Sequence, residues 1–228
     1  MAMDTSPLSK LSPELRNDIY HEVLLRDDAI EFVASSLFRR YSCRYTCTSK
    51  HPREWLALTL TCKQLWRETY GLLFTINSFE ILDPWYGITN TAPSQTVRSF
   101  LNGVVTQSAR AAVKSITLNL GRLESANGET LIPGAVMDLK RNKLAAYPPE
   151  TCVPLRLKFD FVVGYSLGPF GLCETFEIDL QDLAASIGGA LERVEELHQE
   201  TLNGNNAHRY QRLKELVTLK GELRACLE

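Results

Sequence analysis

Apolar residues recur at helical spacing near the start of the chain. The motif Ser12-Pro13-Glu14 supplies a capping hydroxyl, a proline suited to the first helical turn and an acid suited to the positive end of the helix dipole. Leu15, Ile19 and Val23 then follow four residues apart, with polar residues between them. This pattern predicts an amphipathic helix that runs to about residue 25.

The same spacing predicts further helices over about residues 53–73, 94–111, 180–201 and 207–226, with a short one near 135–143. The last two flank the turn signal Asn203-Gly-Asn-Asn206, so we expect them to form a C-terminal helical hairpin. In the final helix, the predicted buried face consists of Tyr210, Leu213, Val217 and Leu223.

Alternating apolar and polar residues predict strands over 115–120, 155–163 and 175–180, because successive side chains of a strand point to opposite faces of the sheet. The second and third of these can pair antiparallel. Residues 75–82 predict another strand, and residues 29–47 favour a short hairpin. Helices and strands alternate without a regular strand–helix–strand rhythm, which favours an α+β fold with a mostly antiparallel sheet.

Three regions follow from this order of elements. Residues 1–82 form an N-terminal region with a hairpin insert, residues 83–180 form a sheet-building α+β region, and residues 181–228 form the helical pair. No low-complexity stretch separates them. We therefore expect the three regions to belong to one compact unit.

Composition and charge narrow the class of protein. The 228 residues are 44% hydrophobic and 23% charged, which is typical of a globular protein, and the net charge of −2 gives no general attraction to nucleic acid or to anionic lipid. No apolar run approaches the roughly 20 residues of a membrane span. The first ten residues lack the apolar segment of a secretory signal. We expect an intracellular protein, cytoplasmic or nuclear, whose six cysteines stay free.

Motifs of enzymatic chemistry are absent from the sequence. It contains no glycine-rich phosphate-binding motif and no Gly-x-Ser-x-Gly elbow, so we expect no enzyme, no catalytic residue and no cofactor. The set Cys43, Cys47 and His51 offers zinc-type ligands, but its spacing is unlike that of common zinc motifs and no fourth ligand follows. These cysteines are therefore interpreted as small hydrophobic side chains and no metal site is predicted.

Two other clusters have a functional and an ordinary interpretation. Basic and aromatic residues interleave over residues 38–53, a combination that can hold single-stranded nucleic acid, although a solvated hairpin or a surface for an acidic partner fits a nearly neutral protein better. Glu174, Glu177 and Asp179 lie on or near one strand, where paired acids can perform acid–base chemistry. On the outward face of a strand, their simpler role is to keep the surface soluble.

The start of the chain resembles a known family. The stretch Leu11-Ser-Pro-Glu-Leu-Arg-Asn-Asp-Ile-Tyr-His-Glu-Val-Leu24, the helix Leu58-Thr-Leu-Thr-Cys-Lys-Gln-Leu-Trp-Arg-Glu-Thr-Tyr-Gly-Leu-Leu-Phe74 and the strand motif Asn77-Ser-Phe79 occur in the order seen in F-box-like domain proteins of filamentous fungi. The resemblance covers about residues 8–82. It implies a non-enzymatic subunit of a Skp–cullin–F-box ubiquitin ligase, which docks on a Skp-type adaptor while the rest of the chain holds a protein target.

The resemblance and the helix pattern together select a partner-binding surface on the first helix. An apolar helical stripe suits docking into the groove of a partner. The alternative is a stand-alone binding, regulatory or effector-like domain with no ligase link, in which the stripe is buried against the protein's own core. Exposure of the stripe distinguishes the two, whereas the target and the oligomeric state are not assigned. The predicted partner-binding residues are Leu11, Pro13, Glu14, Leu15, Ile19, Tyr20, Val23 and Leu24.

Overall fold

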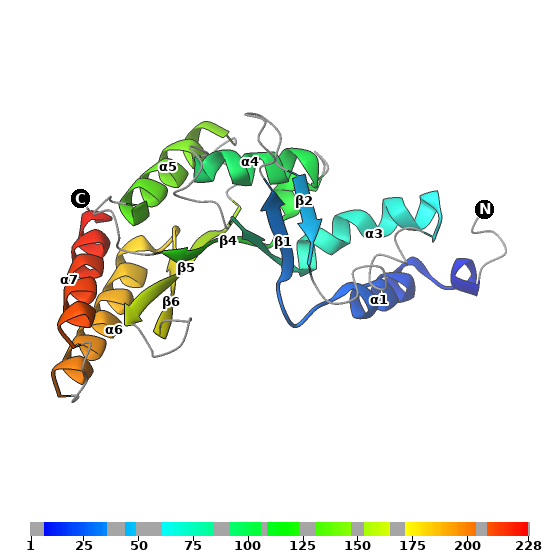
Figure 1. Ribbon diagram of the computed structural model, residues 1–228. Helices are drawn as coiled ribbons and strands as arrows, with labels where there is room; N and C mark the ends of the chain where they lie inside the picture. The colour runs from blue at the N-terminus through cyan, green and yellow to red at the C-terminus, as the bar shows by residue number, and fades with distance from the viewer. Residues whose placement is uncertain are drawn as a thin grey trace.

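The structure is a computed structural model that describes residues 7–35, 44–48, 61–83, 92–105, 109–123, 131–146, 153–164, 172–203 and 209–227. In these ranges the chain forms one mixed sheet with helices packed against it (Figure 1). The elements in chain order are η2 (Pro7–Lys10), α1 (Pro13–Leu24), β1 (Ile30–Ser35), β2 (Arg44–Cys47), α3 (Lys63–Ile76), β3 (Ser78–Leu82), α4 (Pro93–Gly103), η3 (Arg110–Ala112), β4 (Ser115–Leu123), α5 (Leu131–Ala146), β5 (Leu155–Gly164), β6 (Leu172–Asp179), α6 (Leu183–Asn203) and α7 (Arg209–Ala225).

The sheet has the strand order β2-β1-β3-β4-β5-β6. Its inner pairings, β1 with β3, β3 with β4 and β4 with β5, are parallel, whereas the outer pairings of β2 and β6 are antiparallel. The α+β class is confirmed, and so are the hairpin within residues 29–47 and the antiparallel pair β5–β6. The expectation of a mostly antiparallel sheet is wrong. Helices α3, α4 and α5 each lie in a crossover between two parallel strands, as such a connection requires.

The strands of the first and second sequence regions share this sheet. The pairing of β3 with β4 joins residues on either side of position 82, in register from Ser78 with Ser115 to Leu82 with Asn119. No domain boundary therefore falls between these two strands. Near its end, β4 carries an irregularity at Gly121, whose φ of 67° suits glycine and whose N–H donates to the Asn119 side chain at 2.8 Å.

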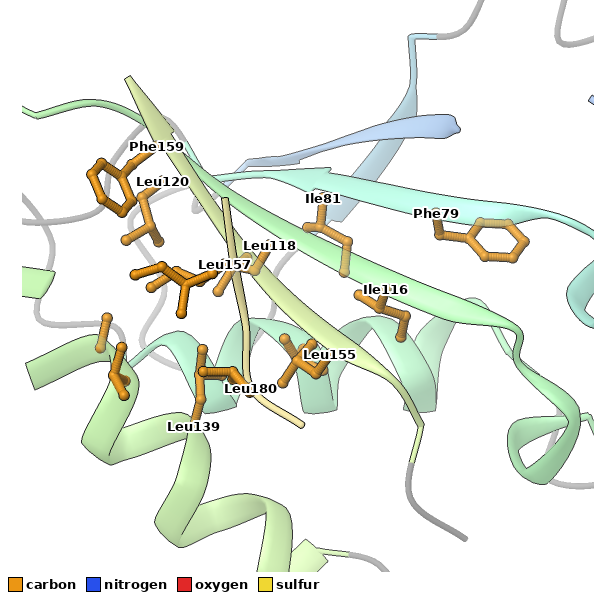
Figure 2. Packing of buried hydrophobic residues seen from close by; sticks show 14 of the residues in the cluster. Phe79, Ile81, Ile116, Leu118, Leu120, Leu139, Leu155, Leu157, Phe159 and Leu180 are labelled. Carbon is orange, nitrogen blue, oxygen red and sulfur yellow. The ribbon is translucent and has the colours of Figure 1, made fainter. Parts of the chain in front are cut away.

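One face of the sheet is apolar and forms the main core (Figure 2). Alternate residues of β3, β4 and β5, such as Phe79, Ile116 and Leu157, point to this face and are fully or almost fully buried. Helices cover it: Phe100 of α4 lies 6.1 Å from Phe79 between ring centroids, and Leu139 of α5 lies in the same cluster. The strict alternation of the strand sequences is thus explained by one apolar face and one polar face.

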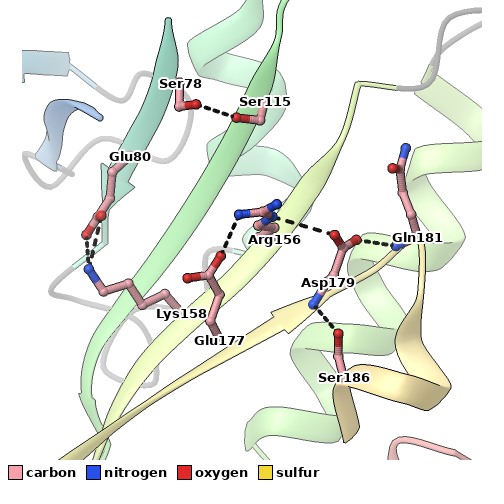
Figure 3. A network of polar contacts seen from close by, with 9 residues as sticks. All are labelled: Ser78, Glu80, Ser115, Arg156, Lys158, Glu177, Asp179, Gln181 and Ser186. Atoms are coloured by element: carbon pink, nitrogen blue, oxygen red, sulfur yellow. Dashed lines mark hydrogen bonds and ion pairs between the residues drawn. The ribbon is translucent and has the colours of Figure 1, made fainter. Parts of the chain in front are cut away.

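The other face of the sheet is a network of polar side chains (Figure 3). Lys158 of β5 donates to both carboxylate oxygens of Glu80 of β3 at 3.1 Å, and Arg156 pairs with Glu177 at 3.0 Å and with Asp179 at 3.5 Å. Arg156 and Glu177 are exposed, so solvent reaches this face. Arg156 and Asp179 are directly opposite each other in the register, Arg156 and Glu177 are diagonal neighbours, and Lys158 reaches Glu80 across β4.

Helix α7 packs beside α5 through a half-buried carboxylate. Glu222 of α7 accepts a hydrogen bond from the backbone N–H of Ile132, in the first turn of α5, while burial raises the pKa of Glu222 above its ordinary value. Because the folded protein binds this proton more tightly than the unfolded chain, the carboxyl favours folding at low pH. That contribution is lost as the pH rises from the ordinary carboxyl pKa through the raised one.

We therefore expect Glu222→Gln to raise stability at pH 7, since the amide oxygen still accepts from Ile132 but carries no buried charge. At pH 4 the two proteins should be nearly equal. Urea denaturation at both pH values measures this difference. Glu196→Gln, at an exposed carboxylate of α6, serves as the control and should show no comparable gain. A Glu222→Gln protein that is less stable at pH 7 would contradict the expectation.

Candidate protein-docking surface

Helix α1 begins where its sequence predicts. Ser12 has extended backbone angles, and its side-chain oxygen accepts the N–H of Leu15 at 3.4 Å, while Pro13 occupies the first turn. The backbone N–H of Glu14 and the Ser12 hydroxyl hold the pKa of the Glu14 carboxyl below its usual value, so the acid stays ionised at the positive end of the helix. The cap and the charge fix the start of the helix.

One side of α1 packs against α3. Tyr20 is fully buried, and its hydroxyl donates to Glu68 of α3 at 2.8 Å. Burial, followed by this carboxylate, raises the pKa of Tyr20 to about 12, so the phenol keeps its proton. For Glu68, burial acts to raise the pKa, but hydrogen bonds from Gln64 and Tyr20 and the charge of Arg16 outweigh it and the net shift is downward. The pair is thus a neutral donor with an ionised acceptor.

Asn77 joins the ends of α1 and α3. Its side-chain amide nitrogen donates to the carbonyl oxygens of Leu24 at 2.9 Å and Leu73 at 3.0 Å, and its side-chain oxygen accepts the N–H of Arg26 at 2.8 Å. The residue is 1% exposed. It therefore satisfies terminal backbone groups of both helices from one buried position, immediately before β3 begins.

The apolar stripe of α1 lies to one side of this packed face and is open to solvent. Leu15 is 53% exposed, Ile19 38% and Val23 42%. The three follow one another at successive helical turns, so they form a continuous row rather than scattered apolar residues. Below, these three side chains are called the α1 stripe.

The other predicted partner-binding residues divide into two groups. Pro13 and Glu14 are exposed and Leu11 is half-buried, so these three border the α1 stripe at its N-terminal end. Tyr20 and Leu24 are fully buried. Their assignment to a partner surface is therefore corrected: the fold itself uses them, because they hold α1 on α3. The i+4 spacing of the stripe predicted the helix but gave no sign of which neighbouring positions α3 would cover.

Sequence reasoning missed the residues that support this surface. Glu68 and Asn77 each fix α1 from another element, and their partners lie 48 and 53 residues away in the chain. In the sequence, a polar residue within a predicted helix or at the start of a strand gives no sign of such a distant contact. Asn77 stands out in the sequence only as the first residue of the family-like motif Asn77-Ser-Phe79.

The other candidate clusters offer no separate site within the described part of the chain. Glu174 pairs with Arg193 at 2.7 Å, and Glu177 and Asp179 share Arg156, so these acids are held by cations on the sheet surface and its edge. Cys43 and His51, and the side chains of the basic region over residues 39–45 and 50–53, lie outside the described residues. Among the residues that are described, no group of three or more His, Cys, Asp or Glu side chains is placed to hold a metal ion.

Comparisons of the chain with protein-family models, curated proteins and solved structures find no match. In the described part of the chain, none of the helices combines the length and apolar character needed to cross a bilayer. The role of the α1 stripe is therefore inferred from its own residues.

Proposed function

We propose that this protein is a non-enzymatic interaction module that docks on a Skp-type adaptor through the α1 stripe and recruits a protein target to a ubiquitin ligase inside the cell. The observation that carries the proposal is the exposure of Leu15, Ile19 and Val23 on a helix that is otherwise firmly attached. Together with the F-box-like order of the N-terminal motifs, it favours docking over a stand-alone domain that buries the stripe.

The chemistry of the surface supports an apolar groove as the partner. The stripe presents aliphatic side chains at successive turns, which is how amphipathic helices anchor in a hydrophobic groove. Exposed acids of α1, Asp18 and Glu22, lie next to the stripe. A partner groove with apolar walls and a basic rim is therefore the best match.

The test is capture of a purified Skp-type adaptor by the full-length protein. Leu15→Asp combined with Ile19→Asp should weaken adaptor binding strongly, because each substitution places a carboxylate in the apolar contact. Central interface anchors contribute about 2 kcal/mol or more each, which corresponds to about a thirtyfold loss of affinity per anchor. Both side chains are exposed, so the thermal unfolding midpoint should change little. Isothermal titration calorimetry measures the affinity.

Val217→Asp is the matched control, because it makes the same kind of change at an exposed apolar residue of α7, far from α1 (Figure 1). It should leave adaptor binding within about twofold of the native value. The proposal fails if the native protein does not bind the adaptor, or if Val217→Asp weakens binding as much as the double substitution in α1.

A further inference from the structure

Helix α7 does not bury the apolar row that its sequence suggests. Leu216, Leu219 and Leu223 face the core, whereas Tyr210 is 82% exposed and Val217 is 61% exposed. The prediction that Tyr210 and Val217 belong to the buried face is therefore wrong. The two residues are two helical turns apart on the outer side of α7. Their exposure is therefore a property of this side of the helix and not of one helix end.

Among the described residues of α7 and α5, the exposed charged side chains all have one sign. On α7 the exposed charged side chains are Arg209, Lys214 and Arg224, and on the neighbouring α5 they are Lys140 and Arg141. The acids of these helices are turned away: Glu215 is buried, and Asp138 and Glu222 are half-buried. Asp138 accepts the N–H of Ser94 of α4 at 2.7 Å, and Glu222 accepts from Ile132.

These five cations form no ion pair with any described residue, unlike Lys220 on the inner side of α7, which bonds to Glu195 of α6. Helices α5 and α7 pack against each other, so their exposed sides lie next to one another. We call this surface the α5–α7 face and define it by Met137, Lys140, Tyr210, Lys214, Val217 and Arg224.

We propose that the α5–α7 face binds an acidic peptide segment that carries apolar anchor residues. Unpaired cations attract carboxylates and steer the encounter, and the exposed Tyr210, Val217 and Met137 offer contact area for aliphatic or aromatic side chains. The whole protein has a net charge of −2, whereas the described residues of these two adjacent helices expose cations and no carboxylate, so an acidic segment would bind here in preference to the rest of the surface.

The neighbouring helix α6 favours a narrow ligand over a broad anionic surface. Helix α6 packs beside α7 and exposes Glu192, and also Glu196 and Glu200, which both pair with Arg193. A flat anionic membrane or a nucleic-acid duplex broad enough to cover both helices would also lie over these carboxylates and gain less from the cations of α7. A single peptide chain that follows α7 and crosses to α5 avoids them.

The position of this face also suits a second docking site. Helices α6 and α7 lie at the opposite end of the molecule from α1 (Figure 1). A peptide bound to the α5–α7 face leaves the α1 stripe free for the adaptor. The proposed function implies that the bound segment belongs to the recruited target. Binding of an acidic segment to this face does not depend on that function.

The experiment is fluorescence anisotropy with the full-length protein and a short labelled peptide in which pairs of Glu alternate with single Leu residues. The native protein should bind it with an affinity that falls as salt is added, and should not bind the same peptide with Lys in place of Glu. Lys214→Glu combined with Arg224→Glu should weaken binding by at least about tenfold, because two attractions become repulsions. The matched control, Arg67→Glu combined with Arg98→Glu, reverses two exposed cations on α3 and α4 and should change affinity less than about twofold.

Several outcomes overturn the inference. The inference fails if the native protein does not bind the acidic peptide, or if the control variant loses as much affinity as Lys214→Glu combined with Arg224→Glu. It also fails if the same residues bind phosphatidylserine vesicles or single-stranded DNA while the peptide does not bind. Thermal unfolding of each variant checks that it is folded. The Leu15→Asp, Ile19→Asp protein should bind the peptide normally, so failure at the α5–α7 face and failure of adaptor docking give different results.

Discussion

Replacing Phe79 with alanine should lower the free energy of unfolding by about 3–5 kcal/mol, the usual range for removing a buried phenylalanine ring. Phe79 is 1% exposed and stacks on Phe74 of α3 with ring centroids 5.2 Å apart. Phe32 of β1 and Phe100 of α4 complete the cluster, at 6.3 Å and 6.1 Å. Because three different elements meet on this ring, its loss leaves a cavity that no single element can move to fill.

Urea denaturation followed by circular dichroism measures this loss. Phe79→Leu is the control, since an apolar side chain of intermediate volume keeps much of the packing and should lose clearly less than the alanine variant. A loss below about 1 kcal/mol for Phe79→Ala would mean that the ring is not at the centre of the core, because an average point mutation lowers the free energy of unfolding by about that amount.

Asn77→Leu should destabilise the protein by about 3 kcal/mol or more. The substitution keeps the approximate size of the side chain but leaves the carbonyls of Leu24 and Leu73 and the N–H of Arg26 without the partners described above. Each buried backbone group without a partner costs about 1–3 kcal/mol. The effect should be local as well as global, because the end of α1 loses its attachment to α3.

Two measurements separate these effects. Chemical denaturation gives the total loss, and hydrogen exchange at the Arg26 amide reports on the junction itself, where protection should fall. The control is Asn17→Leu, the same change at an exposed position of α1, which should alter stability by no more than about 0.5 kcal/mol. Unchanged protection of Arg26 in the Asn77→Leu protein would contradict the role of the side chain.

Local patterns predicted the parts of the fold that local forces determine. The cap at Ser12 sets the start of α1, and the alternation from Leu155 to Phe161 follows directly from a strand with one buried face. The parallel centre of the sheet was not predicted. The irregular connections made the strand–helix–strand order hard to recognise in the sequence. Whether two strands are parallel depends on the edge of the sheet to which the connection between them leads, and the alternation along a single strand carries no information about this.

The last helix shows why a buried face can be misassigned. Tyr210 and Val217 form one apolar row of α7, and Leu216, Leu219 and Leu223 form another, so the sequence contains two candidate faces. Packing against α6, α5 and β5 selects the leucine row. The α1 stripe presents the same problem at the other end of the protein: five apolar positions share one broad face, and only the contacts of α3 decide that Tyr20 and Leu24 are covered.

The attachment of α1 at both its middle and its end has a consequence for association. Tyr20 holds the centre of the helix through Glu68, and Asn77 holds its last turn, so the backbone that carries the stripe is already ordered before any partner arrives. A binding partner then immobilises only a few aliphatic side chains, at about 0.5–1 kcal/mol each for Leu and Ile, and no helix has to form. Recognition at this surface should therefore behave as rigid-body docking, with a rate limited by orientation and not by folding of the helix.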